Sequence, residues 1–259
     1  MSPFDAYIEQ ISKYIQNRHN DGAQVRVLRS PSDPTPIDMT PIRVGPGASS
    51  GIVLKSDTFV ELGSPSAGSC SLVLYSNSSS LVKDGQISLI GPDINESPSA
   101  SLPFGQVITV QGENLNEREY QLLLPNLYVA DRIEGYMVKT TSERIWSRVS
   151  REVAEKGFSF GVLGHALMNL IKSESPEIQA VEILFVTSAK EDLQPLIAIG
   201  EQVEKISREM RGRVWQEKGV DIFDCELGGH CGSCSDKSAC NDVKKMLVTR
   251  RTLSNRANL

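Results

Sequence analysis

Between residues 52 and 111 the sequence consists of short apolar segments, rich in β-branched residues and separated by Gly, Pro, Asn and Ser. Segments of this kind, bounded by turn residues, are typical of β-strands. We predict strands for IVLK (52–55), TFVEL (58–62), SLVLY (71–75), QISLI (86–90) and QVITVQ (106–111). Such short strands satisfy their backbone groups only by pairing with one another, so this part of the chain must build a β-sheet.

The pattern changes to helical periodicity over residues 115–218, with one further strand predicted at 178–186. A short amphipathic helix is predicted for residues 3–19, and a strand for residues 24–28. The longest predicted helix, 191–217, carries one continuous apolar stripe, which is typical of a helix that packs on a core. We therefore expect an α+β fold, or an α/β fold, in which helices cover a small mixed β-sheet.

The composition divides the chain into three parts. Residues 29–51 contain five prolines and three glycines, which predicts an irregular connector. Residues 220–259 are rich in Gly, Cys, Ser and Asp and have few core-forming residues. We predict an N-terminal helix with a proline-rich connector (1–40), an α/β domain (41–219), and a cysteine-rich tail that binds a metal (220–259).

Charge and hydropathy make several classes of partner unexpected. The formal net charge is −5 at pH 7, so there is no electrostatic reason to expect nucleic acid or an anionic membrane as a partner. A transmembrane helix needs about eighteen consecutive apolar residues, and the sequence has no such run. The first residues do not resemble a secretory signal. We therefore expect a cytoplasmic protein without a membrane span.

Four cysteines of the tail, Cys225, Cys231, Cys234 and Cys240, follow the spacing C-x5-C-x2-C-x5-C. In a reducing compartment, clustered cysteines are more often metal ligands than disulfides. Four thiolates suit a 4Fe–4S cluster or a structural zinc, and zinc sites commonly use two C-x2-C pairs, whereas this tail has one. The spacing favours the cluster, with zinc and then free thiols or a disulfide as alternatives.

Two other residues of metal-binding type have simpler interpretations. Cys70 is isolated in a strand-like region, where it is expected to be a small core residue. His165 lies in a predicted helix, where a single histidine is expected to be partly buried and satisfied rather than a ligand.

Four segments of the chain are distinctive: DTFVELGSP (57–65), KDGQISLIGPDI (83–94), the predicted helical stretch 132–158, and VDIFDCELG (220–228). Together they resemble the middle domain of the acetyl-CoA synthase subunit of CO dehydrogenase/acetyl-CoA synthase, a family that makes acetyl-CoA from CO, a methyl group and coenzyme A. The resemblance covers roughly residues 40–228. Within it, the strings VELG, IGPDI and IWSRVS are specific.

The resemblance also concerns the cysteines. In the family, the segment that corresponds to VDIFDC leads into the cysteines of a cluster that bridges to two nickel ions, and Cys225 matches the first of them by position. The other three cysteines of this chain follow a spacing of their own, and the family's Cys-Gly-Cys nickel tripeptide is absent from the sequence. We therefore expect a relative of the middle domain without the C-terminal nickel-binding domain.

The resemblance further links an arginine-rich region around a tryptophan to coenzyme A, and by segment it comprises Arg144, Trp146, Arg148 and Arg151. Guanidinium groups pair with phosphates and an indole can stack on adenine, so the chemistry is reasonable. On a helix, Arg144, Arg148 and Arg151 would share one face. The alternative is an amphipathic helix with a buried tryptophan and solvated arginines.

These expectations lead to one leading function and two alternatives. The leading hypothesis is an iron–sulfur protein that acts as an accessory or electron-transfer subunit, with other protein subunits as partners, in anaerobic one-carbon or acyl-CoA metabolism. The first alternative is a catalytic metalloenzyme subunit with acetyl-CoA synthase-like chemistry. The second is a zinc-stabilised structural or interaction module. Whether the chain is an enzyme is left open by the sequence.

Overall fold

A computed structural model describes residues 2–217 except 34–36, 40, 46, 49, 99, 127–131 and 141–142, together with residue 238. The chain divides into two compact units, Met1–Glu209 and Met210–Leu259. All strands of the described residues lie in the first unit. The predicted boundary at 219/220 lies outside the described residues.

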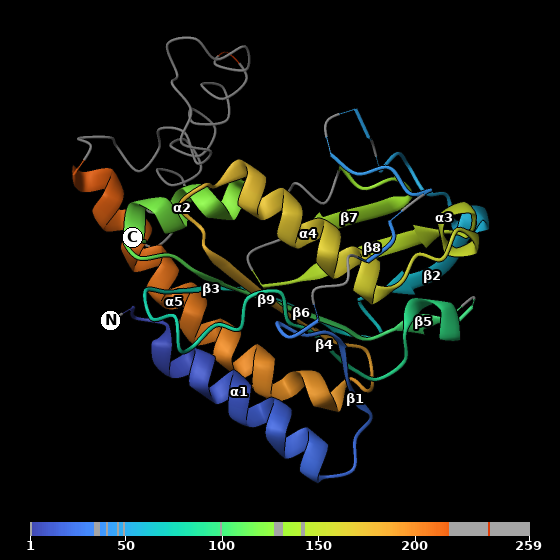
Figure 1. The fold of residues 1–259 in the computed structure, drawn as a ribbon, viewed down its shortest axis with the longest axis horizontal. Coiled ribbons are helices and arrows are strands. Elements are labelled where there is room, and N and C mark those ends of the chain that lie inside the picture. The colour runs from blue at the N-terminus through green and yellow to red at the C-terminus, as the bar shows by residue number, and fades with distance from the viewer. Residues whose placement is uncertain are drawn as a thin grey trace, which may run out of the picture. The chain divides into compact units, whose positions relative to one another are not determined.

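The central sheet of the first unit has the strand order β1-β4-β9-β6-β3 (Figure 1). Its strands are β1 (Val25–Arg29), β4 (Ile87–Ile90), β9 (Ala180–Val186), β6 (Phe104–Gln111) and β3 (Ser69–Ser76). The pairs β4–β9 and β3–β6 are parallel, whereas β1–β4 and β6–β9 are antiparallel. Every residue of β4 and β6 is buried, which requires cover on both faces of the sheet.

Helices supply that cover. On one face, η4 (Glu191–Leu193) and α5 (Gln194–Glu217) approach β6 so closely that a Cβ added to Gly105 would lie 2.8 Å from Leu193 Cδ2. On the other face, α4 (Phe160–Glu174) packs on β4, where a Cβ on Gly164 would lie 2.9 Å from Ile87 Cδ1. Figure 1 shows α1 and α5 below the sheet and α4 above it. Within the described residues, every helix is too short or too polar to cross a lipid bilayer.

The N-terminal helix α1 (Asp5–Asn20) is anchored to the end of β3. The ring of Phe4 is fully buried and packs on Tyr75 and Tyr120, with centroid distances of 5.5 and 5.0 Å. The buried carboxylate of Asp5 accepts a hydrogen bond from Ser76 Oγ at 2.8 Å. Because β1 also pairs with β4, the first thirty or so residues contribute to the same compact unit as the strands.

A second, four-stranded mixed sheet has the order β5-β2-β8-β7. Its strands are β5 (Ser101–Leu102), β2 (Thr58–Leu62), β8 (Ile145–Ser150) and β7 (Tyr136–Thr140). The strand β8 pairs antiparallel with both β2 and β7, and β5 pairs parallel with β2. The fold is therefore α+β with two mixed sheets, where the sequence predicted one.

The helix predicted for residues 132–158 is wrong over most of its length. Residues 136–140 and 145–150 form the β7–β8 hairpin, and within the described part of this stretch the one α-helix is α3 (Arg151–Glu155). In β8 the residues Ile145, Ser147 and Val149 are buried, while Trp146 and Arg148 between them are partly exposed. This period of two is the pattern of a strand with one covered face.

The predicted strands at 58–62, 71–75, 86–90, 106–111 and 178–186 are confirmed, with small differences at their ends. The strand predicted at 52–55 is wrong. Ile52 and Leu54 are exposed, and Lys55–Asp57 forms a short 3-10 helix. The remaining elements are η2 (Ile94–Glu96) and α2 (Glu117–Asn126).

Glu134 holds the connector to the start of the second sheet, beside the isolated bridge between Val44 and Ile133. Its Oε2 accepts hydrogen bonds from the Arg43 backbone N–H at 3.0 Å and from Arg43 Nε at 3.1 Å, and its Oε1 accepts from Lys156 Nζ at 3.0 Å. These hydrogen bonds lower the pKa of Glu134 from 4.5 to about 2. The bond from the Arg43 backbone N–H has the largest effect, and the bond from Lys156 has the second largest.

Replacing Glu134 by Gln should lower the free energy of unfolding near neutral pH by about 1 kcal/mol, because solvent screens these partners. A carboxyl group with a depressed pKa in the folded state stabilises the protein above its unfolded pKa. That stabilisation should therefore be lost as the pH falls from 4.5 to about 2. Urea denaturation at several pH values should show the two proteins converging in stability over this range. A difference that stays constant with pH would contradict the prediction.

Candidate functional site

A cleft of about 650 Å³ lies where the two sheets meet. One wall is the loop from β2 to β3, from Gly63 to Ser69. A second wall comes from the β7–β8 hairpin, through Lys139 and residues 143–146, and a third from Lys190 and the first turns of α5. A volume of this size is typical of small-molecule sites.

Glycines allow the β2–β3 loop to pack tightly against both other walls. Gly63 has a φ of 70°, and an added Cβ would lie 2.3 Å from the carbonyl oxygen of Ile145. Gly68 has a φ of 91°, and an added Cβ would lie 3.1 Å from Cγ of Lys190, so the aliphatic part of that lysine rests on the loop. The Ser71 N–H donates to the carbonyl of Glu143 at 2.9 Å and joins the two sheets beside the cleft.

Charged side chains of both signs line the cleft. Lys139, Arg144 and Lys190 are exposed cations, and Glu143 and Glu201 are the carboxylates. Within the described residues, none of these five forms an ion pair shorter than 4.0 Å. Cations without a carboxylate partner can bind an anion without first breaking an existing pair. The cleft therefore suits an anionic ligand.

Trp146 lines the same cleft, and contacts with Glu61 and Arg148 hold its indole in place. Its Nε1–H donates to Glu61 Oε1 at 3.1 Å, and Arg148 Nε donates to the same oxygen at 3.2 Å. The guanidinium carbon of Arg148 lies 4.9 Å from the centroid of the indole, in cation–π geometry. Arg148 Nη1 also donates to the carbonyl of Val53 at 3.3 Å. The result is a fixed aromatic surface beside the cations, which can stack on a flat ring.

Cys70 lines the cleft, but the exposed fraction of the whole residue is only 1 %. Burial raises the pKa of Cys70 to about 12, so the thiol is protonated at neutral pH and is a poor nucleophile. Its prediction as a small core residue is confirmed. His165 is also as predicted: it is partly buried and contacts Arg29 and Asn169. Burial and Arg29 lower its pKa.

Comparisons with known proteins identify the family. Residues 40–192 match the sequence model of the CO dehydrogenase/acetyl-CoA synthase complex beta subunit. The chain belongs to this family. Among its relatives is the acetyl-CoA decarbonylase/synthase complex subunit beta of Methanothermobacter thermautotrophicus, 28 % identical over 73 % of this chain and 39 % of the relative.

Two further relatives belong to the same family. The beta subunit of the same complex from Methanopyrus kandleri is 30 % identical over 73 % of this chain and 39 % of the relative. The beta 1 subunit from Methanosarcina thermophila is 28 % identical over 77 % of this chain and 42 % of the relative. The chain thus spans about two fifths of the length of the relatives that it matches. The resemblance inferred from its sequence is confirmed.

The structure brings together only part of the predicted coenzyme A site. Arg144 and Trp146 line the cleft, but Arg148 and Arg151 do not. Arg151 is the exposed first residue of α3. The shared helical face predicted for Arg144, Arg148 and Arg151 is wrong, because Trp146 and Arg148 lie in a strand, where alternate residues share a face.

Two cations of the cleft, Lys139 and Lys190, were missed by the sequence analysis. Lys139 lies in β7, five residues before Arg144, and Lys190 lies far from Arg144 in the chain. Both are exposed lysines of the most common kind. The only sequence signal that could have located them is the glycine- and serine-rich loop GSPSAGS (63–69), which is typical of a close backbone approach.

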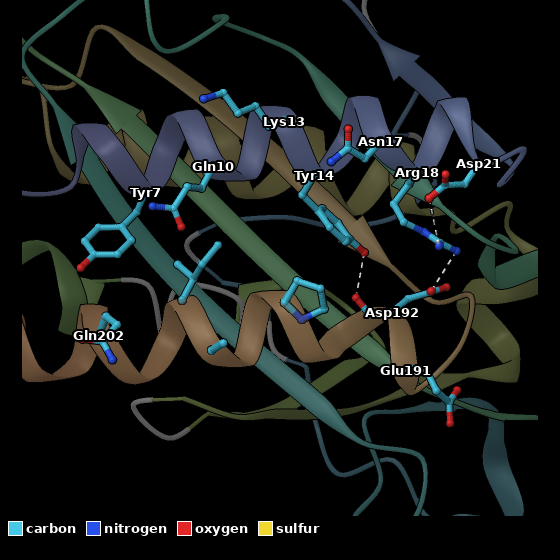
Figure 2. Close-up of a pocket in the computed structure, with 13 residues that line it drawn as sticks. Tyr7, Gln10, Lys13, Tyr14, Asn17, Arg18, Asp21, Glu191, Asp192 and Gln202 are labelled. Atoms are coloured by element: carbon cyan, nitrogen blue, oxygen red, sulfur yellow. Dashed lines mark hydrogen bonds and ion pairs between the residues drawn. The ribbon is translucent and has the colours of Figure 1, made fainter.

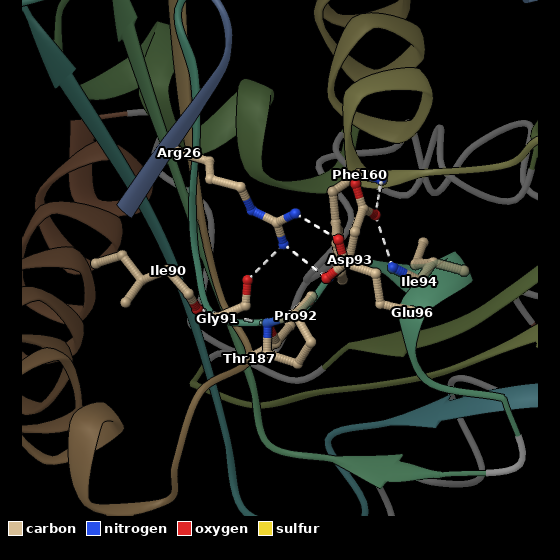
Figure 3. Close-up of polar contacts among 9 residues, drawn as sticks. All are labelled: Arg26, Ile90, Gly91, Pro92, Asp93, Ile94, Glu96, Phe160 and Thr187. Carbon is tan, nitrogen blue, oxygen red and sulfur yellow. Dashed lines mark hydrogen bonds and ion pairs between the residues drawn. The ribbon is translucent and has the colours of Figure 1, made fainter. Parts of the chain in front are cut away.

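The IGPDI segment of the beta-subunit family serves the fold in this chain (Figure 3). Asp93 Oδ1 accepts hydrogen bonds from the N–H groups of Ile94 at 2.6 Å and Phe160 at 2.9 Å, so one carboxylate caps both η2 and α4. Arg26 donates to Glu96 Oε1 at 2.6 Å and to the Gly91 carbonyl at 2.7 Å. These polar groups form hydrogen bonds within the protein, so the segment serves to join η2, α4 and β1.

A second groove, of about 550 Å³, lies between α1 and the η4–α5 segment (Figure 2). Arg18 forms an ion pair with Asp192 at 2.8 Å, and the Tyr14 hydroxyl donates to the Asp192 carbonyl at 2.9 Å. These contacts tie the two helices together at one end of the groove. They account for the positions of Tyr14, Arg18 and Asp192 without a ligand.

The predicted metal ligands Cys225, Cys231, Cys234 and Cys240 lie outside the described residues. In the part of the chain that the structure describes, there is no group of three or more His, Cys, Asp or Glu side chains that could hold a metal ion. The tail cysteines therefore stay the candidate ligands by their sequence alone.

Proposed function

We propose that the chain is an accessory subunit of a complex in one-carbon or acyl-CoA metabolism, and that its cleft binds coenzyme A. The proposal is supported above all by one arrangement: a fixed indole beside Lys139, Arg144 and Lys190, which form no ion pair within the described residues. Coenzyme A combines an adenine ring with several phosphates. Its phosphates would pair with the cations and its adenine would stack on Trp146.

The rest of the proposal depends on the family and on the tail. The relatives are named as subunits of an acetyl-CoA decarbonylase/synthase complex, which supports other protein subunits as partners. Cys225, Cys231, Cys234 and Cys240 would hold one 4Fe–4S cluster, because four thiolates with compact spacing are its usual ligand set. Such a cluster, when bound, accepts and donates single electrons, which suits an electron-transfer subunit.

Replacing Arg144 by Ala should weaken coenzyme A binding at least about tenfold, which corresponds to 1.4 kcal/mol. The expected loss is that of one charge-assisted phosphate contact. Isothermal titration calorimetry should measure it, with Lys139→Ala and Lys190→Ala as parallel variants. A matched control is Arg118→Ala, which removes an exposed arginine of α2 that does not line the cleft.

Dephospho-coenzyme A and pantetheine separate the contributions of the ligand. Pantetheine, which lacks the adenine ring, the diphosphate and the 3′-phosphate, should bind much more weakly than coenzyme A. Absence of calorimetric binding at about millimolar coenzyme A would contradict the proposal. The binding free energy would then be weaker than about 4 kcal/mol.

A further inference from the structure

Arg148 differs from the cations of the cleft because two of its three donor nitrogens, Nε and Nη1, already donate hydrogen bonds within the protein. Its Nε donates to Glu61, its Nη1 donates to the Val53 carbonyl, and its guanidinium lies over the indole of Trp146. It does not line the cleft, whereas Trp146 does. An arginine in this state would have to give up existing contacts before it could bind a phosphate.

We infer that Glu61 and Arg148 form an indole clamp, which fixes Trp146 so that its free surface faces the cleft. Arg148 is then a positioning residue and not an anion ligand. Glu61 is a second positioning residue, which accounts for the acidic residue of the VELG string. This inference rests on the proposed function for the identity of the stacked ligand, but the clamp itself exists without any ligand.

Strand geometry places the clamp on one side of the indole. Alternate residues of a strand share a face and flank one another, so Arg148 flanks Trp146 on one side. Arg144, two residues before Trp146, precedes β8 and lines the cleft. Glu61 of β2 is the direct cross-strand partner of Arg148 in β8. The carboxylate therefore reaches both the guanidinium and the indole N–H from the neighbouring strand.

The contacts are complementary in charge and in shape. Glu61 Oε1 accepts two hydrogen bonds, one from the indole N–H at 3.1 Å and one from Arg148 Nε at 3.2 Å. The side chains of Arg148 and Glu61 have exposed fractions of only 21 % and 26 %. A planar guanidinium can lie flat on an indole and bind a carboxylate at its edge at the same time, which an ammonium cannot do.

The test measures Trp146 without ligand, in a Trp215→Phe background where it is the remaining tryptophan. In time-resolved fluorescence anisotropy, Arg148→Ala and Glu61→Ala should each increase the amplitude of the fast component about twofold, because the ring is released. Arg148→Lys should behave like Arg148→Ala, since it keeps the charge and loses the planar group. Arg144→Ala should leave the anisotropy decay unchanged.

Binding of coenzyme A at several salt concentrations supplies the second measurement. Arg148→Ala and Glu61→Ala should weaken binding about tenfold and keep the salt dependence of the parent protein, because no phosphate contact is lost. Arg144→Ala should weaken binding and reduce the salt dependence. Far-UV circular dichroism and urea denaturation confirm that each variant is folded.

Two results would overturn the inference. One is an unchanged anisotropy decay in both folded variants Arg148→Ala and Glu61→Ala. The other is a loss of salt dependence in Arg148→Ala as large as that in Arg144→Ala, which would make Arg148 an anion ligand. If the parent protein does not bind coenzyme A, the proposed function fails, and the anisotropy decay without ligand alone decides whether the clamp exists.

Discussion

Gly91→Ala is expected to lower the free energy of unfolding by about 3 kcal/mol. Gly91 has a φ of 110°, and a Cβ added there would lie 2.5 Å from the backbone nitrogen of Ser188 and 2.8 Å from Thr187 Oγ1. The substitution therefore combines backbone strain of about 1–2 kcal/mol with a contact against backbone, which cannot move aside as a flexible side chain can. It would also disturb the Gly91 carbonyl that accepts from Arg26 (Figure 3).

Gly157→Ala is the matched control for this prediction. Gly157 has a φ of 89°, but an added Cβ would meet nothing within 4 Å. This variant should therefore lose only the conformational part, about 1 kcal/mol. Urea denaturation followed by circular dichroism would measure both values. If both variants lose the same free energy of unfolding, the close approach of residues 91 and 188 is not what makes a side chain at position 91 unfavourable.

Replacing Cys231 and Cys234 together by Ser should remove most of the iron and acid-labile sulfide from anaerobically purified protein. The two residues form the single C-x2-C pair of the tail, so both ligands on one turn would be lost. The parent protein should be brown, with iron and sulfide near the ratio of a cubane cluster. Iron, sulfide, zinc and nickel analysis of the same preparations would measure the outcome.

Cys70→Ala is the control, because the Cys70 thiol is buried in the cleft region and its pKa is raised to about 12. That variant should retain its iron. A parent protein with one zinc and no sulfide would contradict the electron-transfer proposal and favour a structural role for the tail. Nickel in the parent protein would instead favour a catalytic metalloenzyme subunit.

The strands of the central sheet could be predicted because their signal is local. The segments 71–75, 86–90, 106–111 and 178–186 are short apolar runs bounded by turn residues, and each forms a strand. Such a run needs cover on both faces, so the presence of covering helices also follows from it. The failure at 52–55 has the opposite cause: within the described residues no strand pairs with this run, and Ile52 and Leu54 remain exposed.

The β7–β8 hairpin could not be predicted from residues 132–158 in the same way. Ile145 and Val149 are four residues apart, which fits one face of a helix as well as alternate positions of a strand. Pairing with β2 decides between the two, because it buries Ile145, Ser147 and Val149 together and places Arg148 opposite Glu61. That partner lies more than eighty residues earlier in the chain.

The sequence by itself determined the family, most strands of the central sheet and the spacing of the four tail cysteines, since each depends on residues close together in the chain. Only the tertiary structure decided which charged residues share the cleft. Lys139, Arg144 and Lys190 meet there because a hairpin of one sheet lies beside a loop and a helix that cover the other. Tertiary structure also separated Arg144 from Arg148, since the carboxylate that engages Arg148 comes from a neighbouring strand and not from its own segment.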